Sequence, residues 1–177
     1  PVSSAAPIFR TEQTVDGTVD SARLYITAIG VYEAYINGEQ VGKINKDGTT
    51  TYHHMNPGYG NGTTTIGYET YDVTSYLNDD DPFALSILAG TGWNDGKGDG
   101  AMGSTSGQPA VKAMMVINYT DKDGNQQQKK VATNTEDWKG TLDGPITVNG
   151  VFYGEDYDAR KKAAVGDYKN VGYDDSN

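Results

Sequence analysis

The glycine-rich segment GTGWNDGKGDGAMGSTSGQ, residues 90–108, carries the side chains with the clearest binding chemistry. Trp93 stands directly before Asn94 and Asp95. Sugars bind by stacking their C–H faces on exposed aromatic rings, while amide and carboxylate groups take up the hydroxyls. The segment therefore predicts one edge of a carbohydrate site at Trp93, Asn94 and Asp95. The alternative is that Trp93 closes the end of a strand as a lid on the core, with the glycines only permitting the turn.

Tyr59 and Asn61 offer a second set of the same kind in the loop PGYGNG. An exposed ring beside an amide has the same binding inventory as the first segment. We expect these two residues to contribute to the same function. Trp138, in contrast, is expected to be structural.

A metal loop is the second interpretation of residues 94–99. Oxygen ligands separated by glycines suit Ca²⁺, with Asp95 and Asp99 as the candidate ligands. The segment does not follow the EF-hand pattern, because Lys97 and Ser106 stand where ligands are required. Only a calcium site of another geometry remains, and Ca²⁺ is the one cofactor that the sequence suggests.

Hydrolysis within the chain would need two carboxyl groups flanking a glycosidic bond. Asp95, Asp99, Glu155 and Asp158 all fall in expected loops. With 24 acidic residues in 177, carboxylates in loops are expected by chance. We therefore expect no catalytic residues in this chain.

The composition of the chain limits the classes of molecule that it can bind. The length of 177 residues indicates one domain with a sizeable core. The net charge of −10 argues against nucleic acid and anionic membranes, which need a basic face. The absence of cysteine excludes disulfides, thiolate catalysis and cysteine-bound zinc. It leaves the compartment open, with a secreted or cell-surface bacterial location favoured over the cytoplasm.

The elements that must position these residues are short strands separated by turns. The 23 glycines and 13 tyrosines, together with Thr, Val and Ile, favour strands and turns over helices. Two turn sequences, Asn37-Gly38 and residues 121–124, predict hairpins. Residues 83–89 are almost continuously apolar, as in a central strand covered on both faces. Further strands are expected at residues 22–28, 31–36, 64–73, 113–119, 128–133 and 147–153.

These strands predict an all-β fold, an antiparallel β-sandwich of the jelly-roll type. The expected sandwich covers residues 1–163, and residues 164–177 are expected to form a polar tail leading toward another domain. The one helix-like segment is Val73–Leu77, interpreted as a single turn capped by Thr74.

Several motifs resemble the N-terminal accessory domain of bacterial α-L-rhamnosidases. ARLYITAIGVYEAYINGEQVG (residues 22–42) is similar to the opening of that domain, and Pro57-Gly58-Tyr59 to its Pro-Gly-aromatic loop. YETYDVT (residues 68–74), GTGW (residues 90–93), DWK (residues 137–139) and FYGEDYDAR (residues 152–160) follow in the family's order. Thr91 and Asn94 stand where the family usually has an aspartate and an aromatic residue.

The resemblance covers residues 8–160 and implies a non-catalytic module of a glycoside hydrolase. Such a module would bind carbohydrate, as in an L-rhamnose-containing glycan, or orient it beside a catalytic domain of the same polypeptide. The alternative is a structural domain that packs against its neighbour and has no ligand of its own. Tyr153, Glu155 and Tyr157 are the candidates for such an interface, unless they serve only local strand pairing and an ion pair of Arg160.

Overall fold

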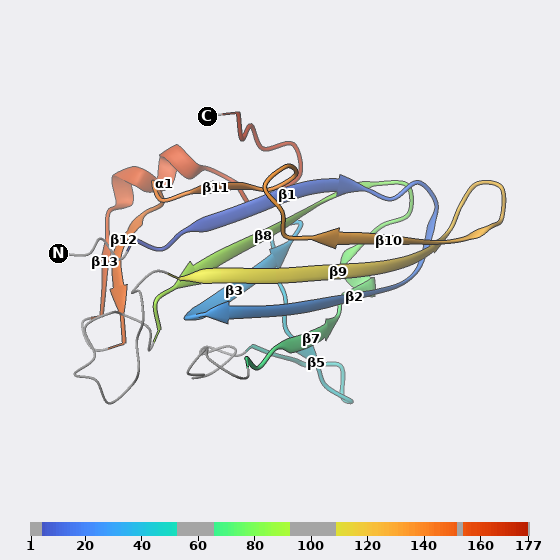
Figure 1. Cartoon of the computed structure of the whole chain (residues 1–177), viewed down its shortest axis with the longest axis horizontal. Helices are drawn as coiled ribbons and strands as arrows, with labels where there is room; N and C mark the ends of the chain where they lie inside the picture. Colours follow the sequence, from blue (N-terminus) through green and yellow to red (C-terminus); the bar gives the residue numbers. More distant parts are fainter. Residues whose placement is uncertain (1–4, 53–65, 93–108, 152–153, 177) are drawn as a thin grey trace.

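The computed structural model describes residues 5–52, 66–92, 109–151 and 154–176, and it places two antiparallel sheets face to face (Figure 1). The five-stranded sheet has the order β11 (Lys139–Thr141), β1 (Ile8–Thr14), β8 (Pro82–Gly90), β3 (Val31–Ile36), β4 (Glu39–Gln40). The four-stranded sheet has the order β10 (Gln126–Ala132), β9 (Ala110–Thr120), β2 (Thr18–Ile29), β7 (Glu69–Asp72). Two smaller pairs are β12 (Ile146–Gly150) with β13 (Gly154–Tyr157), and β5 (Lys43–Ile44) with β6 (Thr50–Thr51).

The core lies between the two large sheets. Along β2, alternate residues are buried, so that Leu24 and Ile26 face inward. Met115 of β9 and Leu85 and Ile87 of β8 meet them in a single hydrophobic cluster. The period of two in the sequence thus puts one face of each sheet into the core.

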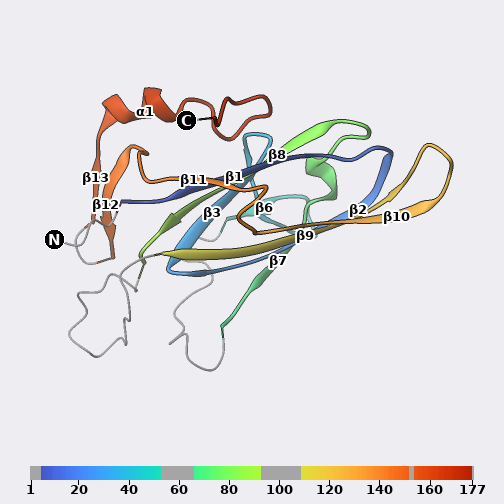
Figure 2. The same ribbon diagram turned by 45° about the horizontal axis from the view of Figure 1, so that its top comes forward.

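The chain alternates between the sheets as it proceeds. β1, β3 and β8 lie in one sheet, whereas β2, β7 and β9 lie in the other (Figures 1 and 2). Neighbouring strands are therefore mostly distant in sequence, as in β1 beside β8 and β2 beside β9. This confirms the predicted antiparallel β-sandwich of the jelly-roll type.

Two features that the sequence predicts from local signals are present in the structure: the central strand over residues 83–89 and the Asn37-Gly38 hairpin. β8 lies between β1 and β3, and it begins at Pro82, where a missing N–H does the least harm. Asn37 and Gly38 turn β3 into β4 with φ angles of 51° and 83°, the two positive values that a type I′ turn requires.

The C-terminal segment, residues 165–176, covers the outer face of the five-stranded sheet (Figure 2). Val165 and Tyr168 are buried with Ile8 of β1, and the hydroxyl of Ser86 on β8 donates to the carbonyl of Tyr168 over 3.0 Å. Residues 164–177, expected as a polar tail, thus contribute apolar contacts to this face. That the segment leads toward another domain remains a prediction.

The helical segments differ from expectation in two ways. Residues 74–76 form a 3₁₀ turn, η1 (Thr74–Tyr76), but the Thr74 side chain does not cap it. The Thr74 hydroxyl instead donates to Asp72 over 2.7 Å and accepts from the N–H of Ala22 over 2.9 Å. The helix α1 (Ala159–Val165) was not expected at all, because seven residues are too short to show apolar periodicity. No helix among the described residues is long and apolar enough to cross a membrane.

Candidate functional site

All of the sequence-predicted ligand side chains lie outside the described residues. Trp93, Asn94, Asp95 and Asp99 belong to residues 93–108, and Tyr59 and Asn61 to residues 53–65. The structure does describe the points at which both segments leave and rejoin the sandwich. These points define the frame of the candidate site.

The exit toward residue 93 is held by one asparagine. Asn149 of β12 accepts the N–H of Thr91 on its Oδ1 over 2.7 Å, and its backbone carbonyl accepts the Thr91 hydroxyl over 3.0 Å. Thr91 is fully buried. The family that this sequence resembles usually has an aspartate at position 91. In this chain the Thr91 side chain points into the domain and bonds to Asn149. Sequence reasoning missed this contact, because Asn149 is 58 residues away.

Glycine is required where the same exit crosses the start of β3. Gly92 has a φ of 54°, and a side chain there would collide with Val31. Gly30 has a φ of 111°, and a side chain there would collide with the carbonyl oxygen of Gly90. Two of the glycines around the predicted site thus serve a close backbone crossing.

Strand register brings both segments to one end of the four-stranded sheet. β7 and β9 are both antiparallel to β2, and they flank it on either side. β7 begins at Glu69 opposite Ile26, and β9 begins at Ala110 opposite Ile29. Because both strands start at the same end of β2, the chain re-enters the sheet there after residues 53–65 and again after residues 93–108.

Exposed aromatic rings mark this end of the sheet. Tyr68, directly before β7, is 64% exposed, and its ring lies 6.4 Å from that of Tyr25 at a tilt of 47°. Thr27 holds the approach to β7 by donating its hydroxyl to the Gly67 carbonyl over 2.5 Å. Tyr52, which directly precedes residues 53–65 and follows β6, is also exposed.

Of the acidic candidates that the structure describes, Asp158 has a structural role. Asp158 caps α1 by accepting the Arg160 N–H over 3.1 Å, and it also accepts from the Arg160 guanidinium over 2.9 and 2.8 Å. These hydrogen bonds lower the pKa of Asp158 to about 2. A carboxyl group held ionised in this way is a poor general acid at neutral pH. Glu155 lies on β13 opposite Asn149 and is exposed.

The described residues contain no group of three or more His, Asp or Glu side chains that could hold a metal ion. Trp138 is in the core cluster, and its indole N–H donates to the carbonyl of Ala132 over 3.1 Å, as its expected structural role requires.

A hollow of about 690 Å³ lies between β3, the end of α1 and the segment after it. The Lys169 ammonium sits 3.3 Å from the centre of the Tyr35 ring, and the Tyr35 hydroxyl donates to Glu33 over 2.6 Å. Burial lowers the pKa of Lys169, and burial with the Glu33 contact raises that of Tyr35. Lys169, Tyr35 and Glu33 thus hold the C-terminal segment on β3.

Comparison with known proteins decides the family. Residues 17–177 match the model of the α-L-rhamnosidase N-terminal domain. The chain belongs to this family. An α-L-rhamnosidase of Formosa agariphila is 33% identical over 97% of this chain, and one of Streptomyces avermitilis is 34% identical over 99% of it.

Solved structures of α-L-rhamnosidases share the fold of this N-terminal domain. The Streptomyces avermitilis enzyme complexed with L-rhamnose aligns over 99% of the chain with a TM-score of 0.78 and 33% identity. The Aspergillus terreus enzyme aligns over 98% with a TM-score of 0.75 and 32% identity. The chain covers only 16% and 18% of these two proteins, and 17% and 15% of the two relatives named above.

Proposed function

We propose that this domain is a non-catalytic module that binds L-rhamnose-containing carbohydrate and orients it for a catalytic domain of the same polypeptide. The proposed ligand residues are Trp93, Asn94 and Asp95 in one segment and Tyr59 and Asn61 in another. The parent protein would be an α-L-rhamnosidase, a glycoside hydrolase.

One observation carries the proposal: both candidate segments rejoin the four-stranded sheet at the same end of β2. Tyr59 and Asn61 belong to one of these segments, and Trp93, Asn94 and Asp95 belong to the other, more than 30 residues later in the sequence. Both segments are thereby connected to the same end of the four-stranded sheet. A sugar site needs such convergence, because one loop rarely supplies both a stacking ring and hydroxyl partners from two directions.

The comparisons support the choice of sugar. The Streptomyces avermitilis α-L-rhamnosidase has been solved with L-rhamnose bound, and it is 33% identical to this chain over the aligned region. Rhamnose carries an apolar methyl group, which suits an aromatic neighbour such as Trp93. Asp95 and Asp99 are the proposed ligands if Ca²⁺ assists binding.

The test is calorimetric titration of L-rhamnose into the domain, with CaCl₂ and again with EDTA. We expect heat that disappears in the Trp93→Ala, Asp95→Ala double variant. The matched control is Tyr157→Ala, Asp123→Ala, which removes one exposed tyrosine and one turn aspartate elsewhere. Heat that persists in EDTA keeps the sugar site and removes the metal.

The alternative is an interdomain packing role. Tyr157, Leu142 and Val151 are exposed apolar side chains around β11, β12 and β13, and Tyr157 is 53% exposed. The Arg160–Asp158 pair beside them is local, because its members are two residues apart in the sequence. The Arg160 side chain is 90% exposed. If millimolar rhamnose, with or without Ca²⁺, gives no heat, this structural role replaces the binding proposal.

A further inference from the structure

The two large sheets differ in what covers their outer faces. The C-terminal segment lies over the outer face of the five-stranded sheet, where Ser86 and Arg10 are buried. None of the described residues lies over the outer face of the four-stranded sheet, and every second residue of β2 and β9 is accessible there. This open face carries residues that the rhamnose site does not use.

Register arranges the side chains of the open face in rows. In one row Arg23 of β2 and Lys130 of β10 lie on either side of Val116 of β9. The next row joins Tyr25 of β2 to Met114 of β9. The row after that places Lys112 of β9 opposite Thr27 of β2. Cations therefore flank an aromatic and apolar row on both of its sides.

Tyr25 in the middle row and Tyr68, which lies just before β7 and diagonal to that row, form a stacking surface. Their rings lie 6.4 Å apart and are tilted by 47°, and Met114, 38% exposed, continues the surface onto β9. Neighbouring strands lie about 4.8 Å apart, so the row from β7 to β9 spans roughly 10 Å. Two sugar rings fit along such a row.

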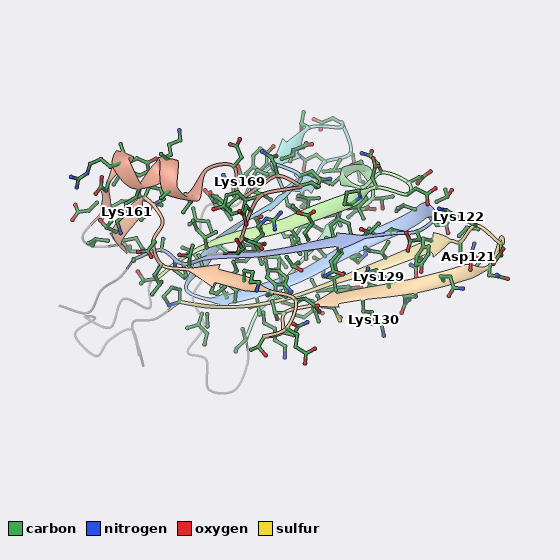
Figure 3. All side chains as sticks on the ribbon, turned by 90° about the horizontal axis from the view of Figure 1, so that it is seen from above. Asp121, Lys122, Lys129, Lys130, Lys161 and Lys169 are labelled. Carbon is green, nitrogen blue, oxygen red and sulfur yellow. The ribbon has the colours of Figure 1, made fainter. Side chains whose placement is uncertain are left out.

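The three cations are exposed on this face, and Arg23 interacts electrostatically with Asp72 across the β2–β7 pair. Arg23, Lys112 and Lys130 are exposed, and none forms an ion pair within 4.0 Å with a described residue. Figure 3 shows Lys130 next to Lys129 on β10; Lys129 donates instead to the carbonyl of Thr14 over 2.8 Å. Asp72, opposite Arg23, is the one carboxylate that the described residues place in these three rows, so the rows carry a net charge of +2 in a chain of −10.

Polar side chains extend the face beyond the row of Arg23. Asn118 donates its amide to the Ser21 hydroxyl over 3.0 Å and accepts from the Gln128 amide over 2.9 Å. Amide and hydroxyl groups in a row suit the hydroxyls of a sugar chain, for which they both donate and accept.

From these features we propose that the outer face of β7, β2, β9 and β10 is a second binding surface, and that its ligand is a polysaccharide containing uronic acid. The face consists of Arg23, Tyr25, Tyr68, Lys112, Met114 and Lys130. Sugar rings stack on the two tyrosines, and the ring carboxylates reach the cations on either side of the row. This proposal does not depend on the rhamnose site, because it uses other residues and another chemical group.

A uronic acid chain fits better than a nucleic acid, which also binds to cations and rings. The chain's overall charge of −10 repels both polyanions, so the preference rests on the amide and hydroxyl groups of Asn118, Ser21 and Gln128, which suit the hydroxyls of a sugar chain. The family of this domain also belongs to enzymes named for a sugar substrate.

The test is biolayer interferometry of the 177-residue chain on immobilised polygalacturonate, on its fully methyl-esterified form and on a single-stranded oligonucleotide. We expect binding to polygalacturonate that weakens as NaCl rises from 20 to 300 mM, through screening of the exposed charges. The ester form has the same sugar chain without its charges, and there we expect at least tenfold weaker binding. Equal binding to both forms, tighter binding to the oligonucleotide, or no binding to polygalacturonate would overturn the proposal.

Matched variants locate the surface. Tyr68→Ala should weaken binding about fivefold, the equivalent of one stacked ring, whereas the control Tyr157→Ala, also an exposed tyrosine, should not. Lys112→Glu combined with Lys130→Glu should weaken binding at least tenfold, whereas Lys161→Glu combined with Lys162→Glu on α1 should not. Since all four lysines are at least partly exposed, a thermal melt will show that the variants fold; Lys112→Glu alone serves if the pair does not. Equal losses in control and test variants would assign the binding to another part of the chain.

Discussion

At the scale of single residues, Arg10 is the buried charge on which the C-terminal segment depends. Its guanidinium donates to the carbonyls of Tyr168 and Asn170, each over 3.0 Å, and pairs with Asp175 and Glu12. The residue is 4% exposed. Five donors in a fixed fork explain why arginine and not lysine occupies this position.

Arg10→Ala should therefore destabilise the chain by about 3 kcal/mol, because it removes the buried guanidinium that joins the carbonyls of Tyr168 and Asn170 and the Asp175 carboxylate to β1. Urea unfolding followed by circular dichroism measures the loss. Arg160→Ala is the matched control, since that arginine is also paired with an aspartate but its side chain is 90% exposed. The prediction is wrong if both variants unfold at the same urea concentration.

Asp158 makes a prediction about pH. Its pKa is lowered to about 2 by the Arg160 hydrogen bonds, from an unfolded value of about 4. A lowered folded-state pKa means that the cap stabilises α1 above pH 4, and that this contribution is lost as the pH falls from about 4 to about 2. Carboxyl ¹³C chemical shifts should place the midpoint of Asp158 near pH 2. In Arg160→Ala the midpoint should rise toward 4; an unchanged midpoint would mean that the backbone N–H alone sets it.

At the scale of elements, the Asn37-Gly38 turn connects the sandwich to the C-terminal segment. The Gly38 N–H donates to the carbonyl of Lys169 over 2.9 Å, and a side chain at Gly38 would collide with the side-chain oxygen of Asn170. Gly124, in the β9–β10 turn, has nearly the same φ (84° against 83°) but open space around it. Comparing a substitution at Gly38 with the same substitution at Gly124 therefore distinguishes the cost of a positive φ from the cost of crowding by Asn170.

Gly124→Ala should cost about 1 kcal/mol, which is the penalty of a positive φ for a residue with a side chain. Gly38→Ala should cost about 1 kcal/mol more, because Asn170 must also move. Urea unfolding of the two variants side by side gives the difference. Equal losses would show that Asn170 moves away without cost.

The elements also show which signals a sequence carries. β8 and the Asn37-Gly38 hairpin follow from composition and turn chemistry alone, because an apolar run and a pair of positive φ angles each have few local solutions. β1 (IFRTEQT) was not expected as a strand: its buried members include Arg10 and Thr11, whose burial depends on partners at residues 168–175. α1 had one signal that was available, the Asp158 side chain before an Ala-Arg-Lys-Lys run.

The candidate site divides in the same way. The sequence predicts the residue types of a sugar site at Trp93 and Tyr59, and the register of β7 and β9 with β2 shows that the chain rejoins one end of the sheet after each of these segments, which no local pattern contains. The Thr91–Asn149 contact likewise joins residues 58 positions apart. Pairings of this kind arise from the whole sheet and have no short motif.

At the scale of the whole molecule, the described residues cover one outer face of the sandwich and leave the other open. The covered face is apolar and buries charge, whereas the open face carries exposed cations and tyrosines. The two faces therefore serve different purposes: one belongs to the stability of the domain, and the other is available to a partner.

Removing residues 167–177 tests the role of the covered face. The truncation takes away Tyr168 and the carbonyls that Arg10 and Ser86 require, and it exposes Ile8 and Leu88. We expect a loss of about 4 kcal/mol, which for a chain of this length lowers the Tm by roughly 8–16 °C. Differential scanning calorimetry measures the change, and truncation at residue 175, which leaves Asp175 as the last residue, is the control. If the long truncation melts at the same temperature as the full chain, the contacts of Arg10 and Tyr168 contribute nothing to the stability of the fold.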